Sequence, residues 1–198
     1  MKTSLYPLAV LVLAAGPLAS PAHGQDWTPT TTDLLRTEKT GFGPAWIFDN
    51  KTAVVAEAKT KTNARPGLVR TTDGGKTFQP CGAYHARALP RWQGEKLYWL
   101  VEGALLVTAD QGEQWTKLSD VKDGRVGPVF GTEAKQLFVL TGGGILESGD
   151  GGATWGKPIP LPKELKGVSP LTWLEYDPVH DTLYVMKMGS ELFKLERK

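Results

Sequence analysis

The chain has 198 residues, with 23 Lys or Arg and 21 Asp or Glu, so its formal net charge is only +2. A chain this close to neutral gives no electrostatic case for nucleic-acid or membrane-surface binding. The single Cys81 excludes an internal disulfide framework, and core packing must therefore stabilise the fold. Many glycines and prolines, with short Val, Leu, Thr and aromatic runs between them, favour strands over helices.

The first 24 residues have the features of a secretory signal peptide. Lys2 precedes an apolar run at 8–15, and small residues with prolines then lead to an expected cut before Gln25. The apolar run is too short to span a bilayer, and no later segment has 18 apolar residues. We expect a secreted or periplasmic mature chain, residues 25–198, without an integral membrane segment; an uncleaved anchor is the alternative.

A short motif recurs three times in the mature chain, each time directly after a strand-like run. It reads Ser or Thr, any residue, Asp, any residue, Gly, two further residues and an aromatic. The copies are TTDGGKTF at 71–78, TADQGEQW at 108–115 and SGDGGATW at 148–155. Their starts are 37 residues apart (71 to 108) and 40 apart (108 to 148), a period typical of propellers, solenoids or arrays.

Each repeat extends into four predicted strands, which together predict a β-propeller blade. The innermost strands are expected within 44–49, 87–93, 126–131 and 171–177, and the second strands within 52–57, 96–102, 135–141 and 181–187. The third strands are expected within 67–70, 104–107, 144–147 and 191–198, and short outer strands within 79–84, 116–121 and 156–160. The stretch 162–167 has room for a single helical turn. The fold class is therefore all-β, with four blades of four antiparallel strands in one domain, residues 25–198.

Aromatic residues on the innermost strands give the expected register of the blades. We expect Trp46, Trp92, Phe130 and Trp173 to hold equivalent places on the innermost strands. The motif aromatics Phe78, Trp115 and Trp155 follow Trp46, Trp92 and Phe130 by 32, 23 and 25 residues. The first blade therefore has an excess of about eight residues between these two positions. They fall in EAKTKTNARPG, residues 57–67, between its second and third strands.

The fourth unit is incomplete, because Arg197 stands where a motif Asp is expected and no outer strand follows. The stretch QDWTPTTTD at 25–33 resembles EQWTKLSDV at 113–121. We therefore expect Trp27 onward to supply the missing outer strand and close a four-bladed ring, which would remove an exposed sheet edge. The alternative is an open arc that closes by pairing with a second copy, so the chain would be a monomer or a homodimer.

The three motif copies resemble the Asp-box, or BNR repeat, of sialidase-like propellers. The same repeat occurs in sortilin-type receptors, xyloglucanases and the photosystem II assembly factor propellers, and YDPVHDTLYV at 176–185 resembles its inner hairpin. The resemblance covers nearly all of the mature chain. It predicts the fold well but not the function, since enzymes, receptors and assembly factors share it.

The chemistry of the box is expected to be structural. A short carboxylate accepts hydrogen bonds from turn amides, the glycine supplies positive φ, and the aromatic covers the turn. The residues in these roles are Asp73, Gly75 and Phe78; Asp110, Gly112 and Trp115; and Asp150, Gly152 and Trp155. One carboxylate per box is too few for calcium, so we expect no metal and no cofactor.

The sequence offers no convincing catalytic set. Resemblance to sialidases implies an arginine triad, a Tyr and Glu nucleophile pair, an Asp acid and an Arg-Ile-Pro motif, but no Arg precedes Pro44 in TGFGPAW at 40–46. A glycosidase needs two facing carboxylates. The one suggestive cluster, Glu175, Asp177, His180 and Asp181, is better interpreted as a turn. We expect no catalytic residues, and a small sialidase-like glycoside hydrolase is the enzyme alternative.

The remaining candidate for a functional site is a surface formed by loops. The loops between outer and next innermost strands, and those between second and third strands, share one face, where loops that depart from a repeat often add binding. The expected binding residues are Lys59, Lys61, Arg65, Tyr84, His85, Arg87, Lys122 and Arg125, with Asp123, Lys163 and Lys166 on the same face. We expect a non-catalytic binding or assembly module for an unknown protein or glycan. A third alternative is a propeller that has no ligand and stabilises a larger partner.

Overall fold

The computed structural model describes residues 41–58, 66–165, 172–189 and 191–197. Within these ranges the regular structure is β, apart from the single 3-10 turn η1 (Lys163–Leu165), which falls in the stretch expected to hold a helical turn. The strands form four separate antiparallel sheets, and each sheet pairs its strands in chain order.

The four sheets are the blades of a β-propeller, as the repeats predicted. Blade 1 holds β1 (Gly41–Ile47), β2 (Ala53–Ala58), β3 (Leu68–Thr71) and β4 (Gln79–Gly82), and blade 2 holds β5 (Arg91–Gln93), β6 (Lys96–Val101), β7 (Gly103–Thr108) and β8 (Thr116–Val121). Blade 3 holds β9 (Gly124–Phe130), β10 (Leu137–Thr141) and β11 (Gly144–Ser148), and blade 4 holds β12 (Thr172–Asp177), β13 (Thr182–Lys187) and β14 (Leu192–Glu196). The outer strand of blade 3 is reduced to a bridge between Ile145 and Ile159.

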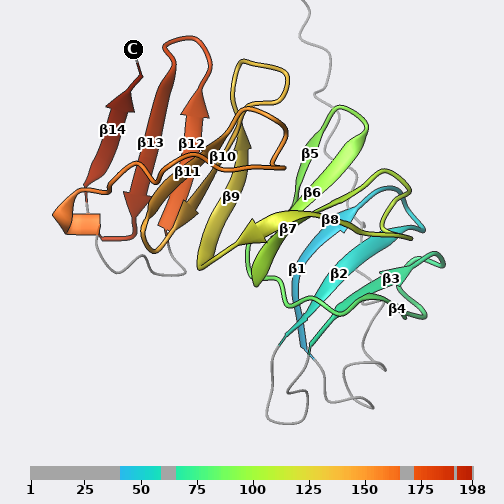
Figure 1. The fold of residues 1–198 in the computed structure, drawn as a ribbon. Helices are drawn as coiled ribbons and strands as arrows, with labels where there is room; N and C mark the ends of the chain where they lie inside the picture. Colours follow the sequence, from blue (N-terminus) through green and yellow to red (C-terminus); the bar gives the residue numbers. More distant parts are fainter. Residues whose placement is uncertain (1–40, 59–65, 166–171, 190, 198) are drawn as a thin grey trace, which may run out of the picture.

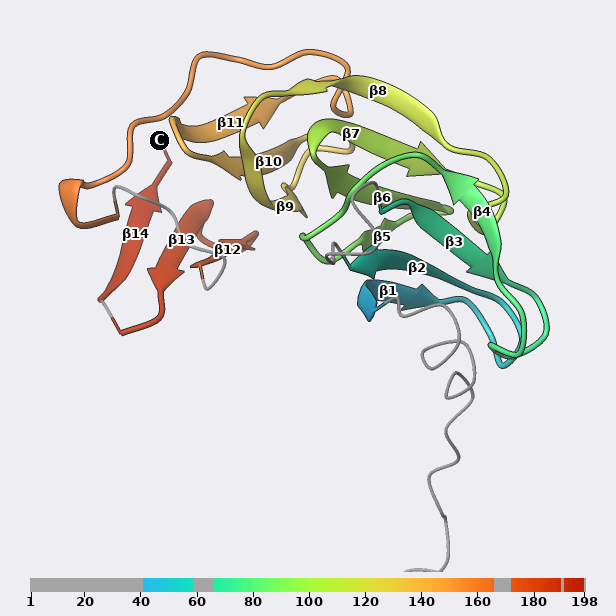
Figure 2. The ribbon, with the colours of Figure 1, turned by 90° about the horizontal axis from the view of Figure 1, so that it is seen from below.

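The blades lie side by side in an arc (Figures 1 and 2). The innermost strands β1, β5, β9 and β12 gather toward the centre, and the later strands of each blade lie toward the rim (Figure 2). Successive side chains on a strand point to opposite faces of the sheet, so a blade can contact one neighbouring blade through each of its two faces. This is why the second and third strands read as nearly continuous apolar runs rather than as strict alternation.

Within the described residues the core consists of three clusters, one between each pair of successive blades. They are built from Val54, Leu68, Leu97 and Trp99; from Leu100, Leu105, Leu137 and Val139; and from Phe138, Leu140, Leu183 and Val185. Neighbouring positions on one strand enter different clusters, as Leu137 and Phe138 do. Each blade is therefore stabilised mainly by the next blade, and its own sheet supplies the hydrogen bonds.

The pairing corrects the expected equivalence of the innermost aromatics. The places opposite Ala53, Leu97, Leu137 and Leu183 are held by Ile47, Trp92, Phe130 and Tyr176. Trp46 lies one residue before this position and Trp173 lies three residues before it, so the expectation was wrong for both. Alignment by residue type failed because a strand position is defined by its cross-strand partner and by the face that it shares with that partner.

These equivalent residues pack on the preceding blade. Trp92 stacks on Trp46 with ring centroids 6.2 Å apart, Phe130 meets Tyr98 at 5.2 Å, and Tyr176 meets Phe138 at 5.4 Å. Ile47 holds the same place in blade 1 and is 65% exposed. In the described part of the chain, therefore, no blade packs over Ile47.

Blade 4 ends the described arc. In blade 3, Leu137 pairs with Ser148, and the motif residue Asp150 follows Ser148 by two residues. In blade 4, Leu183 pairs with Leu195, and Arg197 follows Leu195 by two residues. Arg197 thus takes the place of the motif Asp, as expected. Among the described strands β14 pairs with β13 alone. The closing strand expected from Trp27 onward lies outside the described residues.

We predict that Gly112→Ala destabilises the fold more than Gly151→Ala. Both glycines have φ of +81°, which costs an L residue about 1–2 kcal/mol. A Cβ at Gly112 would also overlap the Val54 side chain, whereas one at Gly151 meets nothing within 4 Å. Overpacking adds about 1–3 kcal/mol, so the loss should be about 2–5 kcal/mol for Gly112→Ala and about 1–2 kcal/mol for Gly151→Ala. Urea unfolding measures both, and equal losses would contradict the close packing at Gly112.

Candidate functional site

The three boxes have the same hydrogen-bonded geometry. In the first, the Thr71 hydroxyl donates to Asp73 Oδ1 at 2.9 Å and accepts the Gly75 amide at 2.9 Å. Asp73 Oδ1 also accepts the amides of Lys76 and Thr77, each at 3.0 Å. The corresponding bonds join Thr108, Asp110 and Gly112, and Ser148, Asp150 and Gly152. The three glycines are buried at φ of +86°, +81° and +93°.

Two of the box aromatics lie against the preceding blade. Trp115 packs on the cluster between blades 1 and 2, and Trp155 packs on the cluster between blades 2 and 3. The Trp155 indole donates to Ser119 Oγ of blade 2 at 2.9 Å, and Ser119 Oγ donates to the Gly152 carbonyl at 2.5 Å. Phe78 lies 5.0 Å from Phe42 within blade 1. In blades 2 and 3 the box therefore joins two blades as well as two strands.

The box carboxylates are held in their charged form. The Thr77 hydroxyl, followed by the Thr77 amide, lowers the pKa of Asp73 to about 2, and Thr154 has the same effect on Asp150. Partial burial raises the pKa of Asp110, but the Gln114 amide and the Thr108 hydroxyl outweigh it, so the net direction is down. Gln114 stands where the other boxes have Thr, which removes one hydroxyl donor.

The connections between antiparallel strands alternate between the two ends of each blade. The boxes and the turns from innermost to second strand lie at one end, the box end. The turns from second to third strand and the loops between blades lie at the other end, the loop face. The described loop-face residues among the expected set are Tyr84, His85, Arg87, Lys122, Asp123, Arg125 and Lys163. Lys59, Lys61, Arg65 and Lys166 lie outside the described residues.

Two short polar pairs stand on successive loops of this face. Arg87 Nε donates to His85 Nε2 at 3.1 Å, and the backbone of His85 is fixed by the Glu102 amide, which donates to its carbonyl at 2.8 Å. Arg125 Nη2 lies 2.6 Å from Asp123 Oδ1 in an exposed ion pair. Lys122, beside that pair, is exposed. Tyr84 differs from the other loop-face residues, because its side chain packs on the core cluster between blades 1 and 2.

The acidic cluster near the end of blade 4 is divided among separate partners. Glu175 pairs with Arg91 at 3.0 Å, from the innermost strand of blade 4 to that of blade 2. Asp177 bonds to His180 Nδ1 at 2.6 Å, an interaction that lowers the Asp177 pKa. Asp181 accepts the Tyr176 hydroxyl at 2.7 Å. The described residues of this cluster therefore form a turn and two side-chain pairs.

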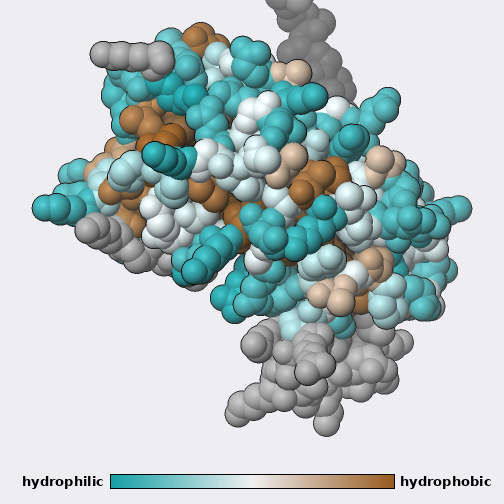
Figure 3. Space-filling view, viewed as in Figure 1, coloured by the Kyte–Doolittle hydropathy of each residue, from teal (hydrophilic) through white to brown (hydrophobic). Residues whose placement is uncertain are grey.

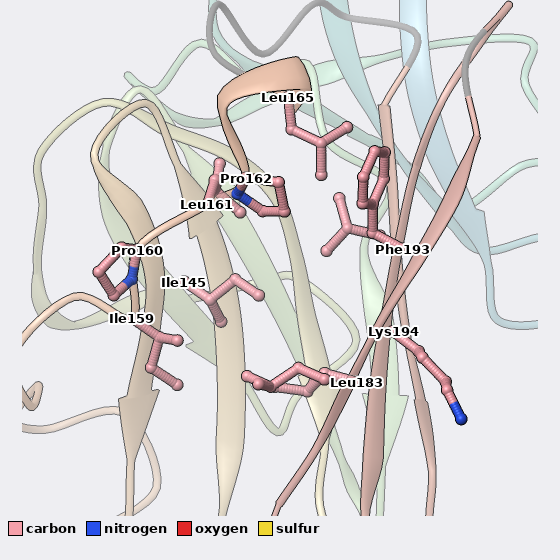
Figure 4. A pocket seen from close by; sticks show the side chains of 11 residues that line it. Ile145, Ile159, Pro160, Leu161, Pro162, Leu165, Leu183, Phe193 and Lys194 are labelled. Atoms are coloured by element: carbon pink, nitrogen blue, oxygen red, sulfur yellow. The ribbon is translucent and has the colours of Figure 1, made fainter.

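An apolar cavity of about 350 Å³ between blades 3 and 4 was not expected from the sequence. Its walls come from β11, from the segment Ile159–Leu165, and from β13 and β14, and Figure 4 shows Leu165 and Phe193 at one end with Ile159 and Leu183 at the other. Apolar residues are also visible on this side of the molecule in the space-filling view (Figure 3). The sequence signal that could have indicated the cavity was the missing fourth box.

Two further classes of site were searched within the described ranges. No group of three His, Cys, Asp or Glu side chains there is close enough to hold a metal ion. None of the helical structure in those ranges has the length and apolarity that a membrane crossing needs.

No family model matches the sequence, and no curated protein matches it. Among solved structures, "YCF48 bound to D1 peptide" is 18% identical, with a TM-score of 0.47 over 79% of this chain and 52% of that one. A GH74 enzyme of Niastella koreensis is 16% identical, with a TM-score of 0.45 over 72% of this chain and 22% of that one. BamB from Moraxella catarrhalis is 9% identical, with a TM-score of 0.43 over 79% of this chain and 51% of that one.

These neighbours are β-propeller proteins. The chain spans about half the length of YCF48 and BamB and less than a quarter of the GH74 enzyme. With identities below 25% and TM-scores below 0.5, the likenesses assign no function. The blade assignment above rests on the strand pairing.

We predict that the boxes make stability depend on pH between about 4 and 2. The folded pKa of Asp73 and Asp150 is about 2 and the ordinary value is 3.8, so their contribution is complete above about 4 and is lost as the pH falls toward 2. The double variant Asp73→Asn, Asp150→Asn should show a smaller fall in urea midpoint over this range. Glu95→Gln, an exposed carboxylate outside the boxes, is the control, and an equal fall in parent and double variant would contradict the assignment.

Proposed function

We propose that the chain is an exported, non-catalytic Asp-box β-propeller that binds a protein or glycan ligand on its loop face. In this proposal residues 1–24 direct export, and residues 25–198 form the binding domain, as a monomer or a homodimer. The mechanism is rigid display: the blades hold the loops, and the loops contact the ligand.

The observation that carries this proposal is the separation of the two ends of the blades. Three hydrogen-bonded boxes with buried glycines lie at the box end, and their turns have little freedom to vary. The loop face instead has a different loop at each blade, with exposed cations at Arg87, Lys122 and Arg125. Such a division is typical of scaffolds that use a constant side for stability and a variable side for binding.

The Asp-box assignment is itself part of the proposal. It is supported by the recurrence of one geometry: in each copy a Ser or Thr hydroxyl joins the Asp carboxylate to the buried Gly amide. The repeated geometry explains why the motif needs a hydroxyl, a short carboxylate and a glycine at fixed spacing. It does not by itself distinguish a receptor from an enzyme.

The binding proposal is tested by pull-down from envelope extract with the mature chain, residues 25–198. We expect a partner to be retained by the parent and lost by the variant Arg87→Ser, Lys122→Ser, Arg125→Ser, because an anionic or polar ligand loses its cations. The variant Lys59→Ser, Lys61→Ser, Arg65→Ser tests the insertion of blade 1 in the same way.

The matched control is Lys51→Ser, Lys76→Ser, Lys135→Ser, which removes three exposed cations at the box end. This control should retain the partner. Equal loss in all variants would indicate a nonspecific charge effect and would contradict loop-face binding. Hydrolysis of fluorogenic glycosides by the parent, abolished by Glu175→Gln, would replace the binding proposal with the glycoside hydrolase alternative.

A further inference from the structure

Two of the boxes show how a box tryptophan packs between successive blades. Trp115 packs on the cluster that includes Leu68, on the third strand of blade 1. Trp155 packs on the cluster that includes Leu105, on the third strand of blade 2, and its indole donates to Ser119 Oγ of the outer strand of that blade. In both places, therefore, the box tryptophan of one blade lies against the outer half of the blade before it.

Strand pairing gives the equivalent place between blades 3 and 4. Ile145 of blade 3 holds the place of Leu68 and Leu105, because each lies three residues before the box Ser or Thr of its blade. Ile145 and Phe193 line the apolar cavity of about 350 Å³ (Figure 4). A cavity of about 150 Å³ lined by Leu, Ile and Phe side chains can hold a benzene ring, so this larger one has room for an indole.

The chain before β1 has the length of an outer strand with its connection to the next innermost strand. Trp27 precedes Gly41, the first residue of β1, by 14 residues. The box aromatics Phe78, Trp115 and Trp155 precede the next innermost strands, β5, β9 and β12, by 13, 9 and 17 residues. In a closed ring the innermost strand that follows blade 4 is β1. Trp27 is therefore spaced from β1 as a fourth box aromatic would be.

The residues around Trp27 also resemble an outer strand in type. QDWTPTTTD at 25–33 resembles EQWTKLSDV at 113–121, which contains the outer strand β8. Pro29 follows the tryptophan by two residues, just as Pro80 of the outer strand β4 follows Phe78 by two. Proline within a sheet is tolerated mainly on edge strands, so its place in this segment suits an outer strand.

We propose that Trp27 of the chain's own N-terminal segment fills the cavity between blades 3 and 4, and that the residues after it pair with β14. The cavity lining consists of Ile, Leu, Val, Pro and Phe side chains, with Lys194 as its charged residue, and such a lining favours an apolar ring. The start of the mature chain is then a structural part of the fold that joins its last blade to its first. The proposal holds whether or not the loop face binds a ligand.

The repeats also give the register in which the segment should pair. In blade 2 the residue after the box tryptophan, Thr116, pairs with Val107. By strand pairing, Lys194 of β14 holds the place of Val107. Thr28, the residue after Trp27, should therefore lie opposite Lys194.

Disulfide trapping in the mature chain, residues 25–198, tests this register, with Cys81→Ser as the background. Thr28→Cys with Lys194→Cys should form an intrachain disulfide on mild oxidation, because paired strand positions lie within the reach of about 4.4–6.8 Å between Cα atoms that a disulfide needs. The product is a monomer with altered mobility on a nonreducing gel and no free thiol.

The matched control combines Thr28→Cys with Tyr184→Cys. Tyr184 lies opposite Lys194 on β13, one strand farther from the proposed position of Thr28. Two strand spacings amount to about 9–10 Å, so this pair should not cross-link. Adding Trp27→Ser to the first pair should slow its cross-linking about tenfold or more, because the segment loses its aromatic anchor.

Three results would overturn the proposal. Equal cross-linking of Thr28→Cys with either partner would show that the segment has no fixed register on β14. A disulfide-linked dimer would show that the segment of a second copy pairs with β14. Cross-linking that Trp27→Ser leaves unchanged would show that the tryptophan does not hold the segment in place.

Discussion

The structure depends on one small hydrogen-bonded unit, in which a Ser or Thr hydroxyl accepts the amide of a buried glycine and donates to an aspartate two residues away. The hydroxyl fixes the glycine in a left-handed conformation that an L side chain resists. The carboxylate then satisfies the turn amides, which would otherwise be unpaired. Because the turn is fixed, Trp115 and Trp155 reach back to the preceding blade, and local geometry becomes contact between blades.

Blade 4 shows what happens when this unit is replaced. Arg197 stands where the aspartate is expected and makes an ion pair with Glu147 of blade 3 at 2.7 Å while lying over the Phe138 ring at 4.6 Å. The arginine therefore joins blades 3 and 4 by charge and stacking at the box end. An apolar cavity of about 350 Å³ lies between the same two blades.

The sequence was sufficient for the blades, because the repeats that predict them depend on spacing along the chain. It was misleading for Trp46 and Trp173, because residue type does not reveal which face of a strand a side chain shares with its cross-strand partner. The ion pair of Arg91 with Glu175 and the cavity between blades 3 and 4 depend on how separate blades meet in space. No local pattern contains that information.

The central claim, that the buried box glycines hold the blades together, is tested most directly by amide hydrogen exchange at Gly75, Gly112 and Gly152. If the boxes anchor the fold, these three amides exchange as slowly as those of fully buried core residues such as Trp99, because both open only on global unfolding. Rapid exchange of the box amides in a protein whose core amides stay protected would show that the turns open locally. The blades would then be held by strand packing alone.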